Sequence, residues 1–192
     1  MDFKKTKTYE NLAKSFAGEC MAGMRYQFTA LLAEQQGYII LSNKIREIAK
    51  NETKHAKVFF DYIIAHGNED ITFCGDFPFK GDTLENGLKF AQEAEIKESS
   101  IVYPDFARIA REEGFDDIAK SFDMIANIEK AHAKNFEMLY NGIKDGTLLK
   151  GREKKLYVCS QCGYSEERES AWNICPLCQA NSGFVDLNLP ND

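Results

Sequence analysis

The sequence is organised around Glu52-Thr-Lys-His55 and its repeat further along the chain, Glu129-Lys-Ala-His132. A Glu and a His three residues apart lie one turn from each other on the same face of a helix. A single pair carries little information, because Glu is common on helix surfaces. Here each pair has an acid upstream, Glu19 before Glu52 and Glu95 before Glu129, at separations of 33 and 34 residues. The chain therefore repeats the pattern Glu, then Glu-x-x-His, at nearly equal spacing.

The acids and histidines of this repeat lie on the apolar stripes of four predicted helices. In steps of three and four residues they alternate with Leu, Ile, Phe and Tyr, so they occupy positions that should face a core. Buried charges are paired or bind metal, because an isolated buried carboxylate is costly. A pair of divalent or trivalent cations would supply the counter-charge that the Lys and Arg of these stripes do not. The alternative, four solvated faces, requires the same coincidence in every helix. The residues concerned are Glu19, Glu52, His55, Glu95, Glu98, Glu129 and His132.

The four helices are long, which is typical of an all-α four-helix bundle. Between the second and third, residues 67–82 contain three glycines and Pro78 and show no helical period. A connection of about 15 residues exceeds the roughly 2–8 usual in bundles, so it can cross the bundle and make these two helices parallel. Pro104 predicts a local break near Tyr103 inside the third helix. The predicted helices span residues 8–36, 42–66, 83–114 and 116–144.

The composition changes after the charged residues 150–155, which we take as a boundary between residues 1–150 and 151–192. The second part contains two C-x-x-C pairs, a strong signal for tetrahedral four-thiolate metal binding. So small a unit needs a metal in place of a core. We expect residues 156–158 to form a strand that pairs with residues 184–187 and Trp172 to fill the interior. Spacing does not separate zinc from iron, although it favours a structural zinc ribbon. The four cysteines are Cys159, Cys162, Cys175 and Cys178.

The composition of the 192 residues is that of a globular protein, with 44% hydrophobic and 28% charged residues. The net charge of -6 and the lack of a long basic run argue against a nucleic-acid partner. No apolar run approaches the ~20 residues that span a bilayer, and no apolar segment follows the first residues as in a secretion signal. We therefore expect a cytoplasmic protein with no membrane contact. In a reducing compartment, Cys20 and Cys74 are expected to be inert small hydrophobic residues.

The metal in the bundle is expected to be iron or manganese, because carboxylate and imidazole ligands suit these ions. The ligand set is that of ferritin-like di-iron and di-manganese bundles. Glu98, one turn after Glu95, is either a further ligand that makes the site asymmetric or an acid beside it. Tyr26 and Tyr103 follow Glu19 and Glu95 by seven and eight residues. They either simply pack in the core or donate to a ligand carboxylate.

With both sites placed, the chain resembles the rubrerythrin family over essentially its full length. One departure is Ser99, where related sequences often have an aromatic residue directly after the second Glu. This change should alter packing beside the site without affecting a ligand. The motifs that carry the resemblance are Ala17-Gly-Glu19, Asn51-Glu-Thr-Lys-His55, Glu95-Ile-Lys-Glu98 with Tyr103-Pro104, Glu129-Lys-Ala-His132, Cys159-x2-Cys162-Gly-Tyr164 and Cys175-Pro-x-Cys178.

The resemblance implies iron at the four cysteines, with zinc as a misloaded alternative, and two irons in a ferritin-like bundle. It also implies reduction of hydrogen peroxide to water as protection against oxidative stress, with electrons passing through the rubredoxin-like iron. By resemblance, Glu19, His55 and Glu98 serve one iron, Glu95 and His132 serve the other, and Glu52 and Glu129 bridge them. One iron of the family exchanges between a His and a Glu, which correspond to His55 and Glu98.

The resemblance further implies an external rubredoxin or flavoprotein reductase as electron donor, linked to NAD(P)H, and a head-to-tail homodimer or larger homo-oligomer. Two other functions are compatible with the same residues. One is a ferroxidase or oxidase that consumes oxygen, and the other is a non-catalytic iron-binding protein with a zinc ribbon. A storage cage would usually lack the four-cysteine unit. Colour distinguishes the metals, since ferric thiolate is red and zinc thiolate is colourless.

Overall fold

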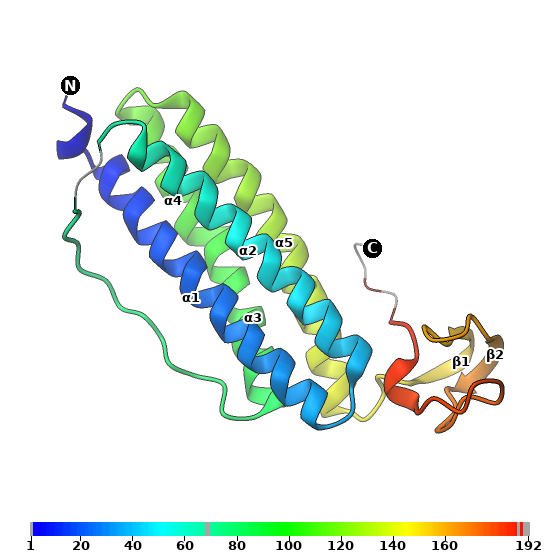
Figure 1. Ribbon diagram of the computed structural model, residues 1–192. Coiled ribbons are helices and arrows are strands. Elements are labelled where there is room, and N and C mark those ends of the chain that lie inside the picture. The colour runs from blue at the N-terminus through cyan, green and yellow to red at the C-terminus, as the bar shows by residue number, and fades with distance from the viewer. Residues whose placement is uncertain (1, 68–69, 188, 190–192) are drawn as a thin grey trace.

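Long helical segments form a bundle, and a small β-rich unit follows it near the C-terminal end (Figure 1). The computed structural model describes residues 2–67, 70–187 and 189. One helical segment is divided into three parts, of which the middle one is a π-helical turn. The other segments are single helices, and a one-turn 3-10 helix precedes the first. The elements are η1 (Phe3–Lys5), α1 (Lys7–Gln35), α2 (Ile39–Ile64), α3 (Leu84–Lys97), the π-helical turn η2 (Glu98–Val102), α4 (Tyr103–Glu112) and α5 (Asp116–Lys144).

The helix ends follow the local sequence. The side chain of Thr83 accepts a hydrogen bond from the backbone N–H of Asn86 at 3.1 Å, as expected for the N-cap of α3. Gly37, with φ +82°, allows the tight turn between α1 and α2. Because that turn is short, α2 begins at Ile39, and the expected start or interruption at Ser42 was wrong. Ser42 is fully buried and its N–H donates to the carbonyl of Tyr38, so it lies inside the helix.

The connection between α2 and α3 crosses the length of the bundle. Its described residues, 65–67 and 70–83, form neither helix nor strand. Figure 1 shows this segment running along the outside of the bundle from the end of α2 to the start of α3. The two helices therefore run in the same direction, which confirms the long crossover predicted from the length of the segment. Ile71 and Phe73 pack against the core and hold one end of it in place.

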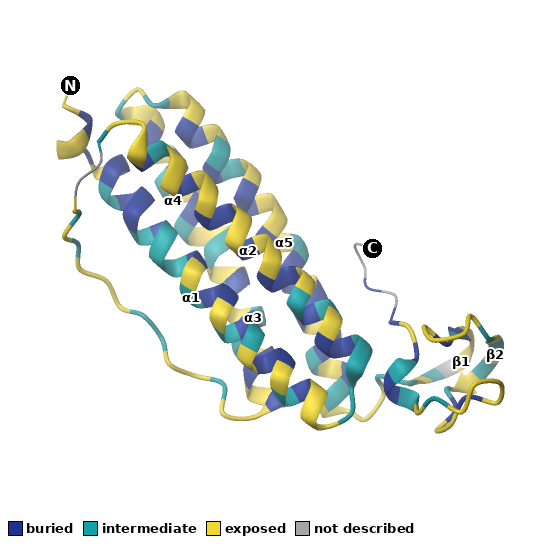
Figure 2. Cartoon of the chain, in the orientation of Figure 1, coloured by how far each residue is buried: buried dark blue, intermediate teal, exposed yellow. Residues whose placement is uncertain are grey.

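The core consists of two hydrophobic clusters with a polar layer between them. One contains Tyr26, Leu41, Leu88 and Phe136, and the other contains Leu12, Phe59, Tyr103 and Phe122, among other buried residues. On each helical segment the acids and histidines lie between the residues of the two clusters. The buried positions face the interior of the bundle, as the alternation of apolar residues predicts (Figure 2). None of the described helices is long and apolar enough to cross a membrane.

The β-rich unit is built on a hairpin of β1 (Lys150–Val158) and β2 (Ser165–Ser170), which pair antiparallel. The sequence predicted the end of β1 but missed β2, because all the residues of β2 are polar. The predicted partner near residue 185 makes a single bridge, between Cys159 and Val185, and is preceded by a 3-10 helix, η3 (Ser182–Phe184). Trp172 is 5% exposed and belongs to the small cluster of this unit, as expected.

The chain returns from this unit to the bundle. Leu187 and Leu189 are each 7% exposed and belong to the hydrophobic cluster that also contains residues of α1, α2 and α5. The backbone N–H of Asp186 donates to the carbonyl of Val158 at 2.8 Å, so the returning segment is held at the base of β1. The C-terminal segment therefore joins the four-cysteine unit to the surface of the bundle.

The close contact of α1 and α3 makes Gly87 a sensitive position. A Cβ atom at Gly87 would lie 2.7 Å from Oγ1 and 2.9 Å from Cγ2 of Thr29. We expect Gly87→Ala to lower the free energy of unfolding by about 1–3 kcal/mol through overpacking. In Gly18→Ala, by contrast, the new Cβ meets nothing within 4 Å, and better helix propensity should stabilise the protein by about 0.5–1 kcal/mol.

Denaturant unfolding of both variants at equal metal content provides the measurement. An equal gain in stability for the two variants would contradict this account of the contact between α1 and α3.

Candidate metal centres

Six buried side chains from the four helical segments meet in the polar layer. They form two groups of four, which share Glu52 and Glu129, and within each group one donor atom per residue lies within 4.8 Å of the others. None of the six is more than 6% exposed. The first group is Glu19, Glu52, His55 and Glu129, and the second is Glu52, Glu95, Glu129 and His132.

Glu52 and Glu129 each present one oxygen to each group. Oε1 of Glu129 lies 2.8 Å from Nδ1 of His55, and its Oε2 lies 2.7 Å from Nδ1 of His132. Glu52 is arranged in the same way. Its Oε2 lies 3.4 Å from Nδ1 of His55, and its Oε1 lies 3.0 Å from Nδ1 of His132. A carboxylate in this position can bridge two cations, one at each histidine. The i, i+3 spacing predicted the Glu-His pairs, and the packing of α2 against α5 brings them together.

Glu19 and Glu95 complete the two groups at their outer ends. Oε2 of Glu19 lies 3.8 Å from Nδ1 of His55, and Oε1 of Glu95 lies 3.9 Å from Nδ1 of His132. Each of these acids belongs to one group and is absent from the other. The site thus has one terminal carboxylate and one imidazole on each side, with two shared carboxylates between them.

The unsatisfied polar atoms of this layer test whether cations fit it. Facing oxygen and nitrogen atoms lie close together, but most are not aligned as hydrogen bonds. A buried polar atom without a partner is costly, so such a concentration needs a physical reason. Cations between the converging atoms satisfy all of them, and carboxylate and imidazole donors suit iron. The atoms without a hydrogen-bond partner among the described residues are Glu19 Oε2, both Oε of Glu52, His55 Nδ1, Glu95 Oε2, both Oε of Glu129 and His132 Nδ1.

The electrostatics of the layer lead to the same conclusion. Burial lowers the pKa of His55, but the carboxylates of Glu129, Glu19 and Glu52 outweigh burial and raise it to about 12. The pKa of His132 is likewise raised to about 9, by Glu129 and Glu52 against the effect of burial. In the absence of metal, protons on the imidazoles therefore supply part of the counter-charge that the carboxylates require.

The pKa values of the two terminal acids, Glu19 and Glu95, are shifted in the opposite direction from the pKa of Glu52. Burial, together with neighbouring carboxylates, raises the pKa of Glu19 and of Glu95 well above the ordinary value. Burial acts on Glu52 too, but its contacts with His132 and His55 dominate and lower its pKa to about 2. The metal-free site therefore carries fewer charges than its four carboxylates would suggest.

Two tyrosines support the terminal acids. The hydroxyl of Tyr26 donates to Oε1 of Glu95 at 2.5 Å, and the hydroxyl of Tyr103 donates to Oε1 of Glu19. Both rings are buried in the hydrophobic clusters, so the tyrosines pack and donate at once. Spacing along the chain did not reveal the pairing, because each tyrosine bonds to an acid on another helical segment. A hydrogen bond of this kind fixes the orientation of a ligand carboxylate.

Glu98 lies beside the two groups and belongs to neither. It is the first residue of the π-helical turn, which is the form taken by the break predicted near Tyr103. Burial and the charges of Glu129 and Glu52 raise its pKa to about 8. Its half-buried side chain lines a cavity of about 550 Å³, which Tyr103 also lines. Turns of this type are frequent at functional sites, and this one places Glu98 between the cavity and the polar layer.

Asn51 is a site residue to which the sequence analysis assigned no role. Its side-chain amide lies 3.3 Å from Nε2 of His132, on the opposite side of the ring from the carboxylates. The atom of Asn51 that faces Nε2 is Nδ2, which donates when Nε2 is unprotonated. If Nδ1 of His132 binds a metal, Nε2 carries the proton, and a turn of the amide presents the oxygen of Asn51 as the acceptor. Asn51 directly precedes Glu52 in the chain, but its reach to α5 depends on how α2 and α5 pack. Leu189 of the returning C-terminal segment lines the same small cavity as Asn51 and His132.

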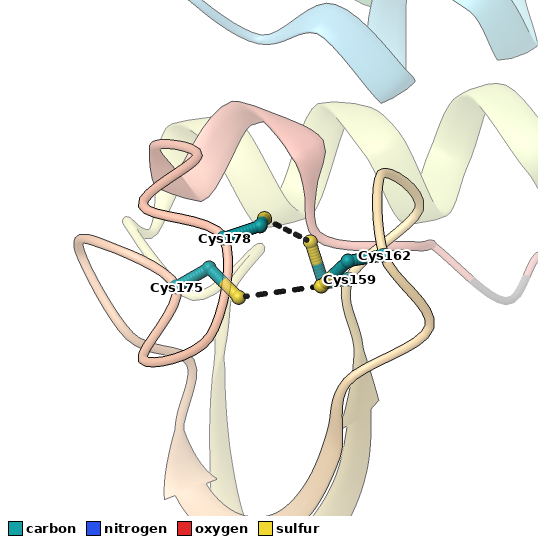
Figure 3. Close-up of side chains that lie close together, drawn as sticks. All are labelled: Cys159, Cys162, Cys175 and Cys178. Atoms are coloured by element: carbon teal, nitrogen blue, oxygen red, sulfur yellow. Dashed lines mark hydrogen bonds between the residues drawn. The ribbon is translucent and has the colours of Figure 1, made fainter.

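The four predicted cysteines form the second candidate centre (Figure 3). The Sγ atoms of Cys159 and Cys178 lie 3.7 Å apart, and those of Cys162 and Cys175 lie 3.8 Å apart. None of the four is in a disulfide. The backbone N–H groups of Cys178 and Leu177 oppose the effect of burial and lower the pKa of Cys175 to about 7, which favours the thiolate. The geometry fits a tetrahedral metal held by four thiolates.

The two remaining cysteines lie outside this cluster. Cys20 and Cys74 are exposed, so neither packs in the interior. Cys20 lies on the outward face of α1, and Cys74 lies in the exposed crossover segment, where helical periodicity says nothing about burial.

A four-helix bundle that encloses a carboxylate and histidine cluster, followed by a four-cysteine cluster, defines a ferritin-like di-iron protein with a rubredoxin-like iron site. The family model described as Rubrerythrin matches residues 10–140. The chain belongs to the rubrerythrin family, whose members are oxidoreductases.

Individual relatives agree over nearly the whole chain. The rubrerythrin of Clostridium perfringens is 43% identical over 187 residues, which are 96% of this chain and 95% of the relative. A solved structure of nigerythrin in a mixed-valent state superposes with a TM-score of 0.62 at 26% identity, covering 96% of this chain and 90% of nigerythrin. A bacterioferritin from Desulfovibrio desulfuricans, solved with its di-iron site in different catalytic states, has a TM-score of 0.65 at 25% identity. This match covers 72% of this chain and 81% of the bacterioferritin chain.

The raised pKa values of the histidines predict that metal loading of the bundle releases protons. His55 and His132 are protonated at neutral pH without metal, and both must be neutral to bind one. We therefore expect about two protons per chain from the imidazoles at pH 7, in addition to those from Glu19 and Glu95. Since the proton on His132 is lost near pH 9, divalent metal affinity should rise as the pH rises from about 6 to 8.

Calorimetric titration of Co²⁺ in two buffers of different ionisation enthalpy measures this release, with the four-cysteine site filled beforehand. Loading that releases no protons at pH 7, or an affinity independent of pH, would show that the histidines are already neutral.

Proposed function

We propose that the protein is a peroxidase that reduces hydrogen peroxide to water at its di-iron site, with electrons delivered through the rubredoxin-like iron. The observation that carries this proposal is the cavity beside the site. Glu98 and Tyr103 both line it, and Tyr103 is bonded to Glu19 of the polar layer. Tyr103 thus links the wall of the cavity to a carboxylate of the site. Family membership supports redox chemistry at the same cluster.

In this proposal Glu19 and His55, with Glu98, hold one iron, and Glu95 and His132 hold the other. Glu52 and Glu129 bridge the two irons, which is supported by the division of their oxygens between the two histidines. Glu98 is the ligand that approaches from the cavity side, while His55 approaches from α2. A ligand on the wall of a cavity is the one best placed to move when a substrate arrives.

Reduction of hydrogen peroxide breaks the O–O bond and consumes two electrons and two protons. When bound, two ferrous irons would supply both electrons, one from each ion. The protein supplies orientation and protons. Tyr26 and Tyr103 hold Glu95 and Glu19 through their hydroxyl groups, and Asn51 holds His132. When His55 rather than Glu98 holds the iron, the free carboxyl group of Glu98 can donate its proton to the departing oxygen.

We further propose that electrons enter at the four-cysteine iron from an external donor, a rubredoxin or an NAD(P)H-linked flavoprotein reductase, in the cytoplasm. The return of the chain links the four-cysteine unit to the bundle, which supports an electron route between the two centres. Val185 bridges Cys159, and Leu189 lines the same small cavity as Asn51 and His132 in the bundle. A head-to-tail homodimer is the expected assembly.

Anaerobic stopped-flow measurements on the fully reduced protein test the function. Mixing with stoichiometric peroxide should restore the ferric-thiolate colour rapidly, and mixing with oxygen should restore it much more slowly. This difference would establish peroxide as the substrate and show that the two centres exchange electrons. A faster return with oxygen favours an oxidase instead. A protein that is colourless in both states holds zinc at its cysteines, which would remove the electron route.

Removal of Glu98 tests the ligand on the cavity side. We expect Glu98→Ala to keep two irons per chain, because the two groups of four residues do not contain Glu98, but to lower peroxide turnover by about 10²-fold or more, in the range of a lost general acid. Glu137→Ala serves as the control, since Glu137 is an exposed acid on α5. Iron content and peroxide-dependent oxidation are measured together. Unchanged turnover in Glu98→Ala would exclude Glu98 from the reaction.

A further inference from the structure

The cavity beside the di-iron site is much larger than hydrogen peroxide requires. Its volume is about 550 Å³, whereas one water takes about 30 Å³ of the liquid and hydrogen peroxide has only one more oxygen. The cavity is roughly ten times larger than such a molecule, and it falls within the range of about 300–1,000 Å³ that holds small organic ligands. An outer groove of about 770 Å³ shares Arg25, Pro78 and Phe90 with it but contains neither Glu98 nor Tyr103.

The walls of the cavity are suited to an apolar body. Phe77, Phe90, Val102 and Phe106 contribute large apolar side chains from the crossover segment, α3, the π-helical turn and α4. The exposed charged residues on its wall carry both signs, as shown by Lys97 and Glu93. A surface of this kind does not select strongly for an anion or a cation, so it fits a neutral ligand with an apolar substituent.

Two residues of α1, Ser15 and Gly18, indicate that the cavity belongs to the di-iron site. Gly18 lines the cavity, and a Cβ atom built there would meet nothing within 4 Å. Close packing therefore does not require a glycine at this point in the middle of a helix, where glycine costs about 0.5–1 kcal/mol relative to alanine. Its effect is to leave the cavity open beside Glu19. Ser15 is 4% exposed, lines the same cavity, and its hydroxyl has no hydrogen-bond partner among the described residues.

The cavity combines polar groups with the apolar side chains of its walls. Glu98 and Tyr103 mark the end that meets the polar layer, and the unpartnered hydroxyl of Ser15 lies on the wall formed by α1. A ligand with one polar end and an apolar body can direct the polar end toward Glu98 and leave the body among the phenylalanines. A buried hydroxyl without a partner is costly, so a hydrogen bond from Ser15 to a ligand would favour binding.

We propose that the cavity lined by Ser15, Gly18, Glu98 and Tyr103 binds organic hydroperoxides, and that these are substrates of the di-iron site alongside hydrogen peroxide. This inference rests on the proposed peroxidase function, since the same irons supply the electrons. The reaction breaks the O–O bond of ROOH, consumes two electrons and two protons, and releases the alcohol ROH and one water. The distal oxygen leaves as water, and the alcohol retains the apolar group in the cavity until it dissociates.

A variant that fills the cavity tests the inference. Gly18→Leu places a side chain in the open space, so the ratio of kcat/KM for cumene hydroperoxide to kcat/KM for hydrogen peroxide should fall by about 10-fold or more. Cys20→Leu is the matched control, because Cys20 is exposed on the same helix and does not line the cavity. Its ratio should equal that of the unmodified protein. Iron content and unfolding midpoint are measured for all three proteins.

Binding is measured separately from turnover with the product alcohol, 2-phenyl-2-propanol, and the air-oxidised, iron-loaded protein. Ligand-observed NMR should show broadening of the alcohol resonances by the unmodified protein and by Cys20→Leu, and loss of broadening with Gly18→Leu.

The possible failures are distinguishable. Reduction of hydrogen peroxide without reduction of cumene hydroperoxide would overturn the inference and leave the proposed function intact. If the ratio of kcat/KM for cumene hydroperoxide to kcat/KM for hydrogen peroxide were equal in Gly18→Leu and the unmodified protein, the cavity would not be the binding site for organic hydroperoxides. Failure to reduce either peroxide, in protein with full iron content, would overturn the proposed function and this inference with it.

Discussion

The fold depends on the burial of four carboxylates in one layer between two hydrophobic clusters. Glu19, Glu52, Glu95 and Glu129 are all within 1% of full burial, and the two imidazoles between them are the nearest groups that can carry positive charge. Such a layer is stable only when protons or metal ions balance it. Metal loading and the stability of the bundle are therefore coupled, because the same atoms serve both.

The two sides of this layer are built differently. On the side of α1 and the π-helical turn, Glu98 and Tyr103 meet a cavity. On the side of α2 and α5, Asn51 holds His132 and the returning C-terminal segment lines a small cavity with it. In the proposed function, the oxidant and the electrons therefore approach the layer from different sides.

The site residues that the sequence predicted are those that follow one another at a fixed spacing along the chain. Helical periodicity placed Glu52 with His55 and Glu129 with His132, and the two C-x-x-C pairs defined the second cluster. Strand β2 was missed because its residues, Ser165–Ser170, are all polar and lack the apolar alternation of a strand. The start of α2 was misplaced because Ser42 resembles a capping residue but is buried inside the helix.

The sequence by itself determined the number of helical segments, the long crossover, the four cysteines and six acids and histidines that cluster, and the family, because each depends on residue type at fixed local spacing. The tertiary structure decided which atoms face each other across helices. It paired Tyr26 with Glu95 and Tyr103 with Glu19, brought Asn51 to His132, and left a cavity beside Gly18. These contacts depend on the rotation and packing of one helix against another, which no periodicity along a single chain encodes.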